Sequence, residues 1–213
     1  MPYLPEDQIE TAARNLRIKL GLDLHSNPDM MTVVVKLKHL GFIKNYRRVP
    51  RAEMPDDEAA FDPFERLLLI REDTFCAMNR DDPRARFTIA HEFGHMELGH
   101  KNTRHRNVSS RRIEKIAPTI KRDEAQANRF AGAFLAPPDS TSSPMDTPVE
   151  AIAKRFNLTS SAARVRKAEL ETIYRRELGI KRPLPQVVVD LLRDARDRGH
   201  SVTSLDDEPK PKK

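Results

Sequence analysis

The 213-residue chain carries 38 Lys and Arg against 32 Asp and Glu, with 16 prolines, seven glycines and one cysteine. Scarce glycine and scattered proline exclude collagen-like and low-complexity classes, and a single cysteine excludes an internal disulfide framework. The longest apolar runs fall far short of the roughly 18 residues of a membrane span, and residues 1–10 lack the features of a signal peptide. We expect a cytoplasmic protein with no membrane contact.

The charge is unevenly distributed along the chain. Residues 1–100 have a net charge of −3, whereas residues 101–213 have a net charge of +9. This asymmetry indicates two regions with different partners. The basic excess suits either a solvated surface or contact with a polyanion or an acidic partner.

The first forty residues predict two helices. Apolar residues of the first recur at helical spacing: Ile9, Ala13, Leu16 and Leu20. We expect the second helix to begin with Asn27 as N-cap and Pro28 in its first turn, and to end at Gly41.

The next segment predicts a small antiparallel sheet followed by a helix. Residues 42–49 are typical of a strand, and two apolar runs at 66–70 and 75–79, separated by four polar residues, predict a β-hairpin. Asp82 as N-cap and Pro83 in the first turn then predict a helix that ends between residues 95 and 99.

The basic segment from residue 101 to 122 has eight Lys and Arg against a single acid, Glu114. It lacks apolar periodicity up to Ile113, so we expect a mobile connection that contributes to partner capture. A second strong helix is predicted from Lys121 to Ala136, because the prolines at 137 and 138 end it.

The pattern predicts a core domain over 1–138, a linker over 139–147, a C-terminal helical region over 148–199 and a disordered tail over 200–213. Within the helical region, residues 150–178 predict a helix-turn-helix-like hairpin, and a further helix follows near 186–198. The residues expected to face inward in the hairpin are Ile152, Phe156, Leu158, Ala162, Val165 and Ile173. Residues 176–213 carry no motif that indicates a role.

The sequence His91-Glu92-Phe93-Gly94-His95 is an H-E-x-x-H motif on a predicted helix. Residues four apart lie on the same side of a helix, so both imidazoles can occupy two corners of one tetrahedral zinc. Glu92 lies about 100° round the helix, where a general base can reach the open coordination position. The motif therefore predicts a zinc hydrolase, in which Glu92 carries the proton from water to the leaving amine.

A third protein ligand is needed, and its identity decides the class of zinc site. The metzincin class is excluded, because Leu98 and Lys101 occupy the positions where it requires glycine and histidine. Two acids remain. Spacing favours Glu114, whereas context favours Glu124, which opens a helix whose small residues at 127 and 131 allow close packing against the metal-bearing helix.

Two segments together resemble the ImmA/IrrE family of metallopeptidases. FTIAHEFGHMELGH, residues 87–100, is similar to the pattern F-T-x-A-H-E-x-G-H, and EAQANRFAGAFLAP, residues 124–137, is similar to E-x-x-A-N-x-F-A-x-x-x-L-x-P. The second segment matches at Glu124, Ala127, Asn128, Phe130, Ala131, Leu135 and Pro137. It departs from the family at Ala136, where methionine is usual. In outline the resemblance covers residues 5–175.

The resemblance implies an α+β fold, with a zincin-like metallopeptidase core, a small antiparallel sheet and a C-terminal helical hairpin. It makes Glu124 the third ligand beside His91 and His95. It also implies a bacterial or phage-borne enzyme that cleaves a helix-turn-helix repressor and so derepresses stress or mobile-element genes. The ligand set suits Zn²⁺, and Mn²⁺ as well.

The sequence leaves three questions open. Neither spacing nor motif identifies the group that stabilises the oxyanion, for which His100 and His105 are candidates beside the alternative that both are ordinary surface histidines. A DNA-binding regulator with a structural or sensory metal site is a second interpretation, based on the basic excess and the helical hairpin with Arg164, Arg166 and Lys167. A binding module with a dead site is a third, although an intact Glu92 argues against it.

Overall fold

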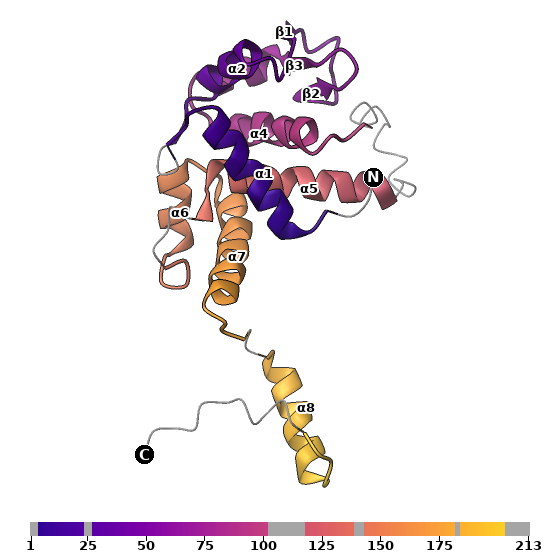
Figure 1. Cartoon of the computed structure of the whole chain (residues 1–213), viewed down its shortest axis with the longest axis vertical. Coiled ribbons are helices and arrows are strands. Elements are labelled where there is room, and N and C mark those ends of the chain that lie inside the picture. The colour runs from indigo at the N-terminus through magenta and orange to yellow at the C-terminus, as the bar shows by residue number, and fades with distance from the viewer. Residues whose placement is uncertain (1–3, 24–26, 102–117, 139–142, 182–183, 203–213) are drawn as a thin grey trace. The chain divides into compact units, whose positions relative to one another are not determined.

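The computed structural model describes residues 4–23, 27–101, 118–138, 143–181 and 184–202, and the chain divides into two compact units, 1–171 and 172–213. The first unit contains a three-stranded sheet and most of the helices (Figure 1). The segment expected to capture a partner lies largely outside the described residues, together with His105 and Glu114, and so does most of the predicted tail.

The two N-terminal helices are confirmed as α1 (Glu6–Lys19) and α2 (Met30–His39). The predicted N-cap of α2 was wrong, because the side chain of Asp29 accepts the hydrogen bond from the backbone N–H of Thr32 at 2.7 Å. Asn27 instead accepts a hydrogen bond from the guanidinium of Arg86 through its side-chain oxygen. The helix therefore begins two residues later than its proline suggested.

The sheet is mixed, so the prediction of an antiparallel sheet was wrong for one strand pair. Strands β1 (Asn45–Val49), β2 (Ala59–Asp62) and β3 (Leu67–Arg71) lie in the order β1-β3-β2, with β1 parallel and β2 antiparallel to β3. The predicted hairpin does not form, because its second half is helix α3 (Glu72–Met78). Thr74 and Met78, one turn apart on α3, are both buried.

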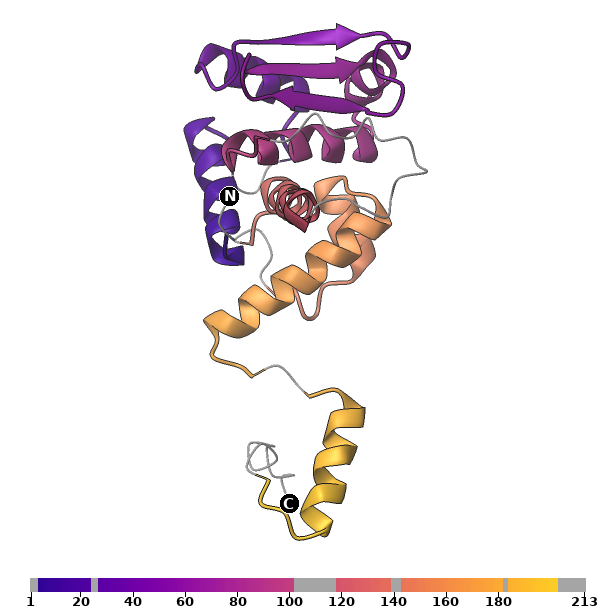
Figure 2. The same cartoon turned by 90° about the vertical axis from the view of Figure 1, so that its right-hand side faces the viewer.

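Two central helices lie in successive layers under the sheet, as Figure 2 shows: α4 (Pro83–Glu97) lies next to the sheet and α5 (Pro118–Leu135) lies beneath it. The predicted cap of α4 is confirmed, since the carboxylate of Asp82 accepts hydrogen bonds from the backbone N–H groups of Arg84 and Ala85 at 3.0 and 2.9 Å. The two phenylalanines Phe93 and Phe134 contact each other edge to face between the helices. These two helices carry the H-E-x-x-H motif and Glu124.

The segment predicted as a helical hairpin contains two helices, α6 (Val149–Phe156) and α7 (Ser160–Glu177). Ile152, Phe156 and Ala163 belong to the same hydrophobic core as α1, α4 and α5, and residues up to 171 group with the first unit. Val165 was expected to face inward but is 61% exposed, and the buried position beside it is Arg166.

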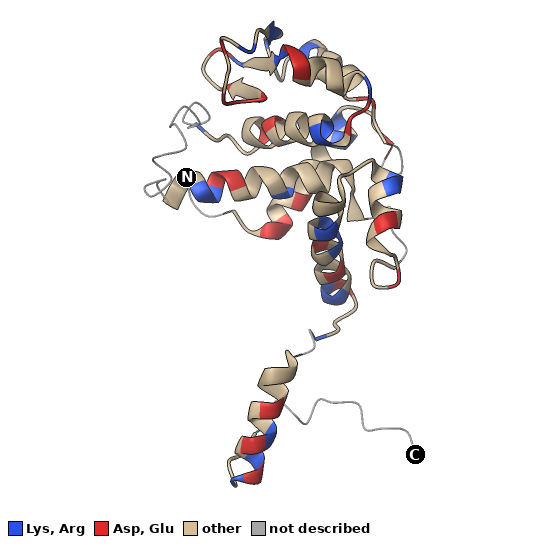
Figure 3. Ribbon diagram, turned by 180° about the vertical axis from the view of Figure 1, so that it is seen from behind, with Lys and Arg blue, Asp and Glu red and all other residues tan. Residues whose placement is uncertain are grey.

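The second unit contains helix α8 (Gln186–Asp197), which confirms the helix predicted near 186–198. Acidic and basic residues are interspersed along α7 and along α8 (Figure 3). Among the described residues, no helix combines the length and the apolar character that crossing a membrane requires.

Candidate metal centre

The two histidines of the motif lie side by side on α4, as the spacing predicts. Their Nε2 atoms are 2.9 Å apart, and both side chains are buried. Their rings meet edge to face with centroids 4.6 Å apart. Two imidazole nitrogens therefore converge on one small region beneath the sheet.

Helix α5 brings a carboxylate to the same region. The Oε2 atom of Glu124 lies 3.3 Å from Nε2 of His91, and its Oε1 atom lies 3.4 Å from Nε2 of His95. Ligand atoms about 2.0 to 2.1 Å from one tetrahedral ion stand roughly 3.3 Å apart, so the two carboxylate distances match such a site. The residues present therefore fit a divalent cation.

Hydrogen bonds on the far side of each ring fix the tautomers. Because amide oxygens only accept, Nδ1–H of His91 donates to Oδ1 of Asn128 at 2.8 Å, and Nε2–H of His100 donates to Oε1 of Gln126 at 3.0 Å. The Nδ1 atom of His100 then accepts the Nδ1–H of His95 at 3.0 Å. Both motif histidines are left with an unprotonated Nε2 lone pair facing the cluster.

Burial favours the neutral form of His95 and of His100. It lowers the pKa of His95 and, likewise, the pKa of His100, because the charged form of each ring would lose its water. Two nitrogen lone pairs and a carboxylate then converge without a proton between the nitrogens, an arrangement that favours a cation at their centre. A set of two imidazoles and one carboxylate suits Zn²⁺ and several other divalent ions.

The carboxylate of Glu92 lies beside the cluster and is held by the sheet. Its Oε2 atom accepts a hydrogen bond from the backbone N–H of Phe61 in β2 at 2.8 Å, and its side chain is buried. Its oxygen and the ring nitrogens of His91 and His95 lie within 4.8 Å of one another. Two carboxylates thus approach the histidines, but only that of Glu124 spans both Nε2 atoms, so Glu124 is the better placed ligand.

A helix-ending turn positions His100 behind His95. Gly99 has a φ of +68°, and the backbone N–H groups of His100 and Gly99 donate to the carbonyls of His95 and Met96 at 3.0 and 3.3 Å. This is the Schellman arrangement. His100 is 1% exposed with both ring nitrogens engaged, so its geometry favours orienting His95 over stabilising an oxyanion.

Sequence reasoning missed Gln126 and Asn128 as parts of the site. The available signal was their spacing on α5, because Asn128 lies one turn after Glu124 and so on the same face. The interpretation of Arg166 as a DNA contact also loses its basis, since this guanidinium is 1% exposed and binds Glu10 through two hydrogen bonds of 2.8 Å.

A family model described as the IrrE N-terminal-like domain, Peptidase_M78, matches residues 61–167, half of the chain. The chain belongs to this family. The match to the IrrE N-terminal-like family confirms the resemblance, and it includes both histidines, Glu92 and Glu124. The matched family is described as a peptidase family, and the described residues of the chain include a His-Glu-His cluster that could hold a metal ion.

One solved structure similar to the chain is described as a Mycobacterium tuberculosis transcriptional regulator, with 18% sequence identity and a TM-score of 0.47. The similarity covers 76% of this chain and 46% of that one, so the chain spans less than half the length of that structure. No curated protein gives a significant match.

Proposed function

We propose that the chain is a metal-dependent endopeptidase whose ion is held by His91, His95 and Glu124. The observation that carries this proposal is the convergence of both Nε2 atoms on the two oxygens of Glu124, at 3.3 and 3.4 Å. Family membership supports the same conclusion. Zn²⁺ is the ion we favour, with Mn²⁺ as the alternative that this ligand set also suits.

Glu92 is the general base in this proposal. A zinc ion bound at the cluster would polarise the scissile carbonyl and lower the pKa of its water to about 7. The carboxylate of Glu92 would accept a proton from the attacking water and pass it to the leaving amine. The hydrogen bond from Phe61 N–H to Oε2 keeps the carboxylate beside the cluster during both transfers.

The proposed substrate is a transcriptional repressor with a helix-turn-helix fold, whose cleavage derepresses stress or mobile-element genes. The support is the likeness of both signature segments to the ImmA/IrrE family. Because such a repressor acts on DNA inside the cell, we place the reaction in the cytoplasm.

The test is incubation of the purified full chain, loaded with Zn²⁺ or with Mn²⁺, with a helix-turn-helix repressor encoded beside its gene, followed by intact-mass analysis. Unstructured β-casein serves as a second substrate. One pair of fragments from the repressor supports the whole proposal. Cleavage of β-casein alone supports the peptidase activity but contradicts the repressor as its substrate. Absence of cleavage of both proteins with either metal contradicts the peptidase.

A further inference from the structure

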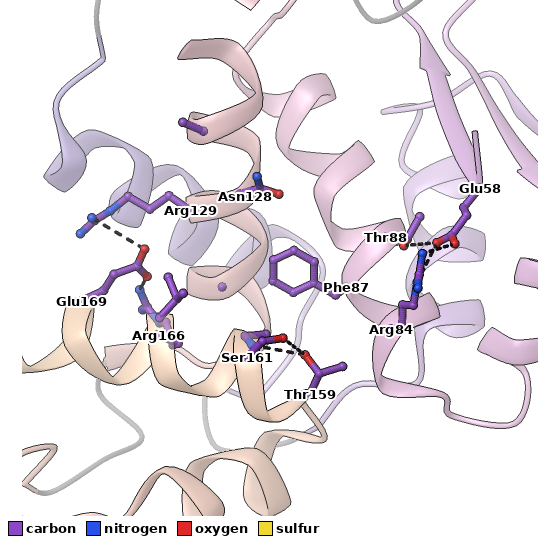
Figure 4. A pocket seen from close by; sticks show the side chains of 14 residues that line it. Glu58, Arg84, Phe87, Thr88, Asn128, Arg129, Thr159, Ser161, Arg166 and Glu169 are labelled. Atoms are coloured by element: carbon purple, nitrogen blue, oxygen red, sulfur yellow. Dashed lines mark hydrogen bonds and ion pairs between the residues drawn. The ribbon is translucent and has the colours of Figure 1, made fainter. Parts of the chain in front are cut away.

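A cavity of about 610 Å³ is lined by residues of α4, α5 and α7 together with Glu58 and Thr159 (Figure 4). Two lining residues connect it to the cluster. Asn128 hydrogen-bonds to His91, and Thr88 lies almost one turn before His91 on α4. Volumes of roughly 300 to 1,000 Å³ are typical of ligand sites, so the cavity has the size of a binding site, and its lining residue Asn128 contacts the Nδ1 side of His91.

The cavity is long enough for a segment of chain. Along α4 its lining runs from Thr88 back to Arg84, and along α5 it runs from Ala125 to Gly132. At 1.5 Å per residue, the lining along α5 from Ala125 to Gly132 is about 10 Å long, the length of about three extended residues. The cavity therefore accommodates several consecutive side chains.

The polar groups of the wall are already paired with one another. The guanidinium of Arg84 lies 2.6 Å from Glu58, whose other oxygen accepts the hydroxyl of Thr88 at 3.1 Å. At the opposite end, Arg166 donates to Glu169 at 2.9 Å. The remaining polar lining side chains also have partners: Asn128, Arg129, Thr159 and Ser161. A charged ligand would lose water here without gaining a free counter-charge.

The centre of the cavity is apolar. Figure 4 shows the ring of Phe87 between the two polar ends, and the cavity is also lined by Ala125, Gly132, Ala162 and Val165. Val165 keeps 61% of its surface exposed, although it lies one position from a fully buried residue of α7. Covering such a surface with an apolar side chain is favourable, because it removes apolar area from water.

We propose that this cavity selects the substrate, by binding uncharged, apolar side chains that lie within about three residues of the cleaved bond. The proposal rests on the peptidase function and adds the chemical class of the segment that is cut. Its basis is the hydrogen bond that joins the lining residue Asn128 to His91, the apolar centre of the cavity and the pairing of the wall charges. Val165 is the residue on which it is best tested, because its side chain is exposed, lines the cavity and is none of the proposed ligands.

The first experiment maps cleavage sites by mass spectrometry, with the zinc-loaded full chain and a library of proteome-derived peptides. We compare Val165→Asp and Val165→Lys with Val35→Asp, which changes an exposed valine of α2, 49% accessible and outside the cavity. Wild type and Val35→Asp should favour apolar residues within three positions of the cut. Both Val165 variants should cut such sites with kcat/KM at least tenfold lower, and their residual preferences should shift toward basic and toward acidic residues, respectively.

The second experiment measures binding without cleavage, using the zinc-loaded Glu92→Gln chain and fluorescein-labelled tetrapeptides Leu-Phe-Ala-Leu and Asp-Ser-Ala-Glu. Fluorescence anisotropy should show at least tenfold tighter binding of the apolar peptide, lost when Val165→Asp is added and kept when Val35→Asp is added. Equal binding of both peptides, or discrimination that survives Val165→Asp, overturns the cavity proposal. Discrimination in this assay without any cleavage by wild type supports the cavity and contradicts the peptidase.

Discussion

A Cβ atom on Gly94 would lie 3.0 Å from the Cα atom of Ala127, so glycine at this position brings the backbones of α4 and α5 into contact. The same Cβ atom would lie 3.1 Å from the carbonyl oxygen of Ala127 and 3.1 Å from Cβ of Phe130. These contacts set the spacing between the helix of the two histidines and the helix of Glu124. The close spacing lets one carboxylate side chain reach both imidazoles.

Replacement Gly94→Ala should force the two helices apart by a few tenths of an ångström. Alanine normally stabilises a helix interior by about 0.5 to 1 kcal/mol relative to glycine, but here we expect a loss of about 1 to 3 kcal/mol from overpacking. Zinc affinity should fall at least tenfold. Urea unfolding and a competitive zinc titration measure the two effects.

The matched control is Gly132→Ala, also in a helix interior, where the nearest atom to the new Cβ is the side-chain Cδ of Arg166 at 3.3 Å. That neighbour can move, so zinc affinity should stay unchanged. If the Gly94→Ala chain had the stability and the zinc affinity of wild type, the spacing between α4 and α5 would not determine the geometry of the site.

His100 should act on zinc affinity through His95. His100→Ala removes the acceptor of the His95 Nδ1–H, and loss of such partners typically weakens metal binding about 10 to 100-fold. Gln126→Leu should have a smaller effect in the same direction, and Gln126→Glu should retain affinity because it keeps an acceptor for His100. The control is His39→Ala, at an exposed histidine of α2. Unchanged affinity in His100→Ala would contradict the positioning role.

The parts of the fold that sequence predicts well have local signals. Asp82 and Pro83 define the start of α4, and the spacing of the histidines defines the face that carries the cluster. Helix α3 was missed because a five-residue apolar run reads equally well as strand or helix. The burial of Thr74 and Met78, four residues apart, comes from packing that the short run does not reveal.

Other parts of the site depend on tertiary contacts. Arg166 would be assigned to the surface by composition, yet it is buried because Glu10 on α1, 156 residues earlier, supplies its counter-charge. Because Arg166 occupies the inward-facing position of α7, the neighbouring Val165 faces outward. The position of His100 near His95 could have been predicted from sequence. A glycine directly after a helix end, here Gly99, usually indicates a turn that brings the next residue back toward the helix.

Arg166 should be essential for stability. Its guanidinium binds Glu10 and Glu169 and donates to the carbonyl of Ala136 at 2.9 Å. Arg166→Ala removes these bonds and leaves the two largely buried carboxylates with only the more distant Arg129, at 3.3 and 3.9 Å. We expect a loss of about 3 to 5 kcal/mol in urea unfolding. Arg164→Ala, at an exposed position of the same helix, should change stability by less than about 0.5 kcal/mol. Similar small losses for both would contradict a structural role.

Metal content should distinguish the two candidate third ligands. Glu124→Ala removes a carboxylate that spans both histidines, so the chain should lose most of its metal at nanomolar free zinc and its unfolding temperature with zinc should fall. Glu114→Ala should stay loaded. Elemental analysis after gel filtration measures both variants. An empty site in Glu114→Ala beside a loaded Glu124→Ala would make Glu114 the ligand.

The most direct test of the peptidase is Glu92→Gln, measured for bound metal and for cleavage of β-casein in the same preparation. This variant keeps both histidines and Glu124 and removes only the proton carrier. It should hold about one zinc ion per chain, as wild type does, and lose nearly all cleavage. Cleavage at the wild-type rate, or loss of the metal together with the activity, would contradict the role of Glu92 as the base.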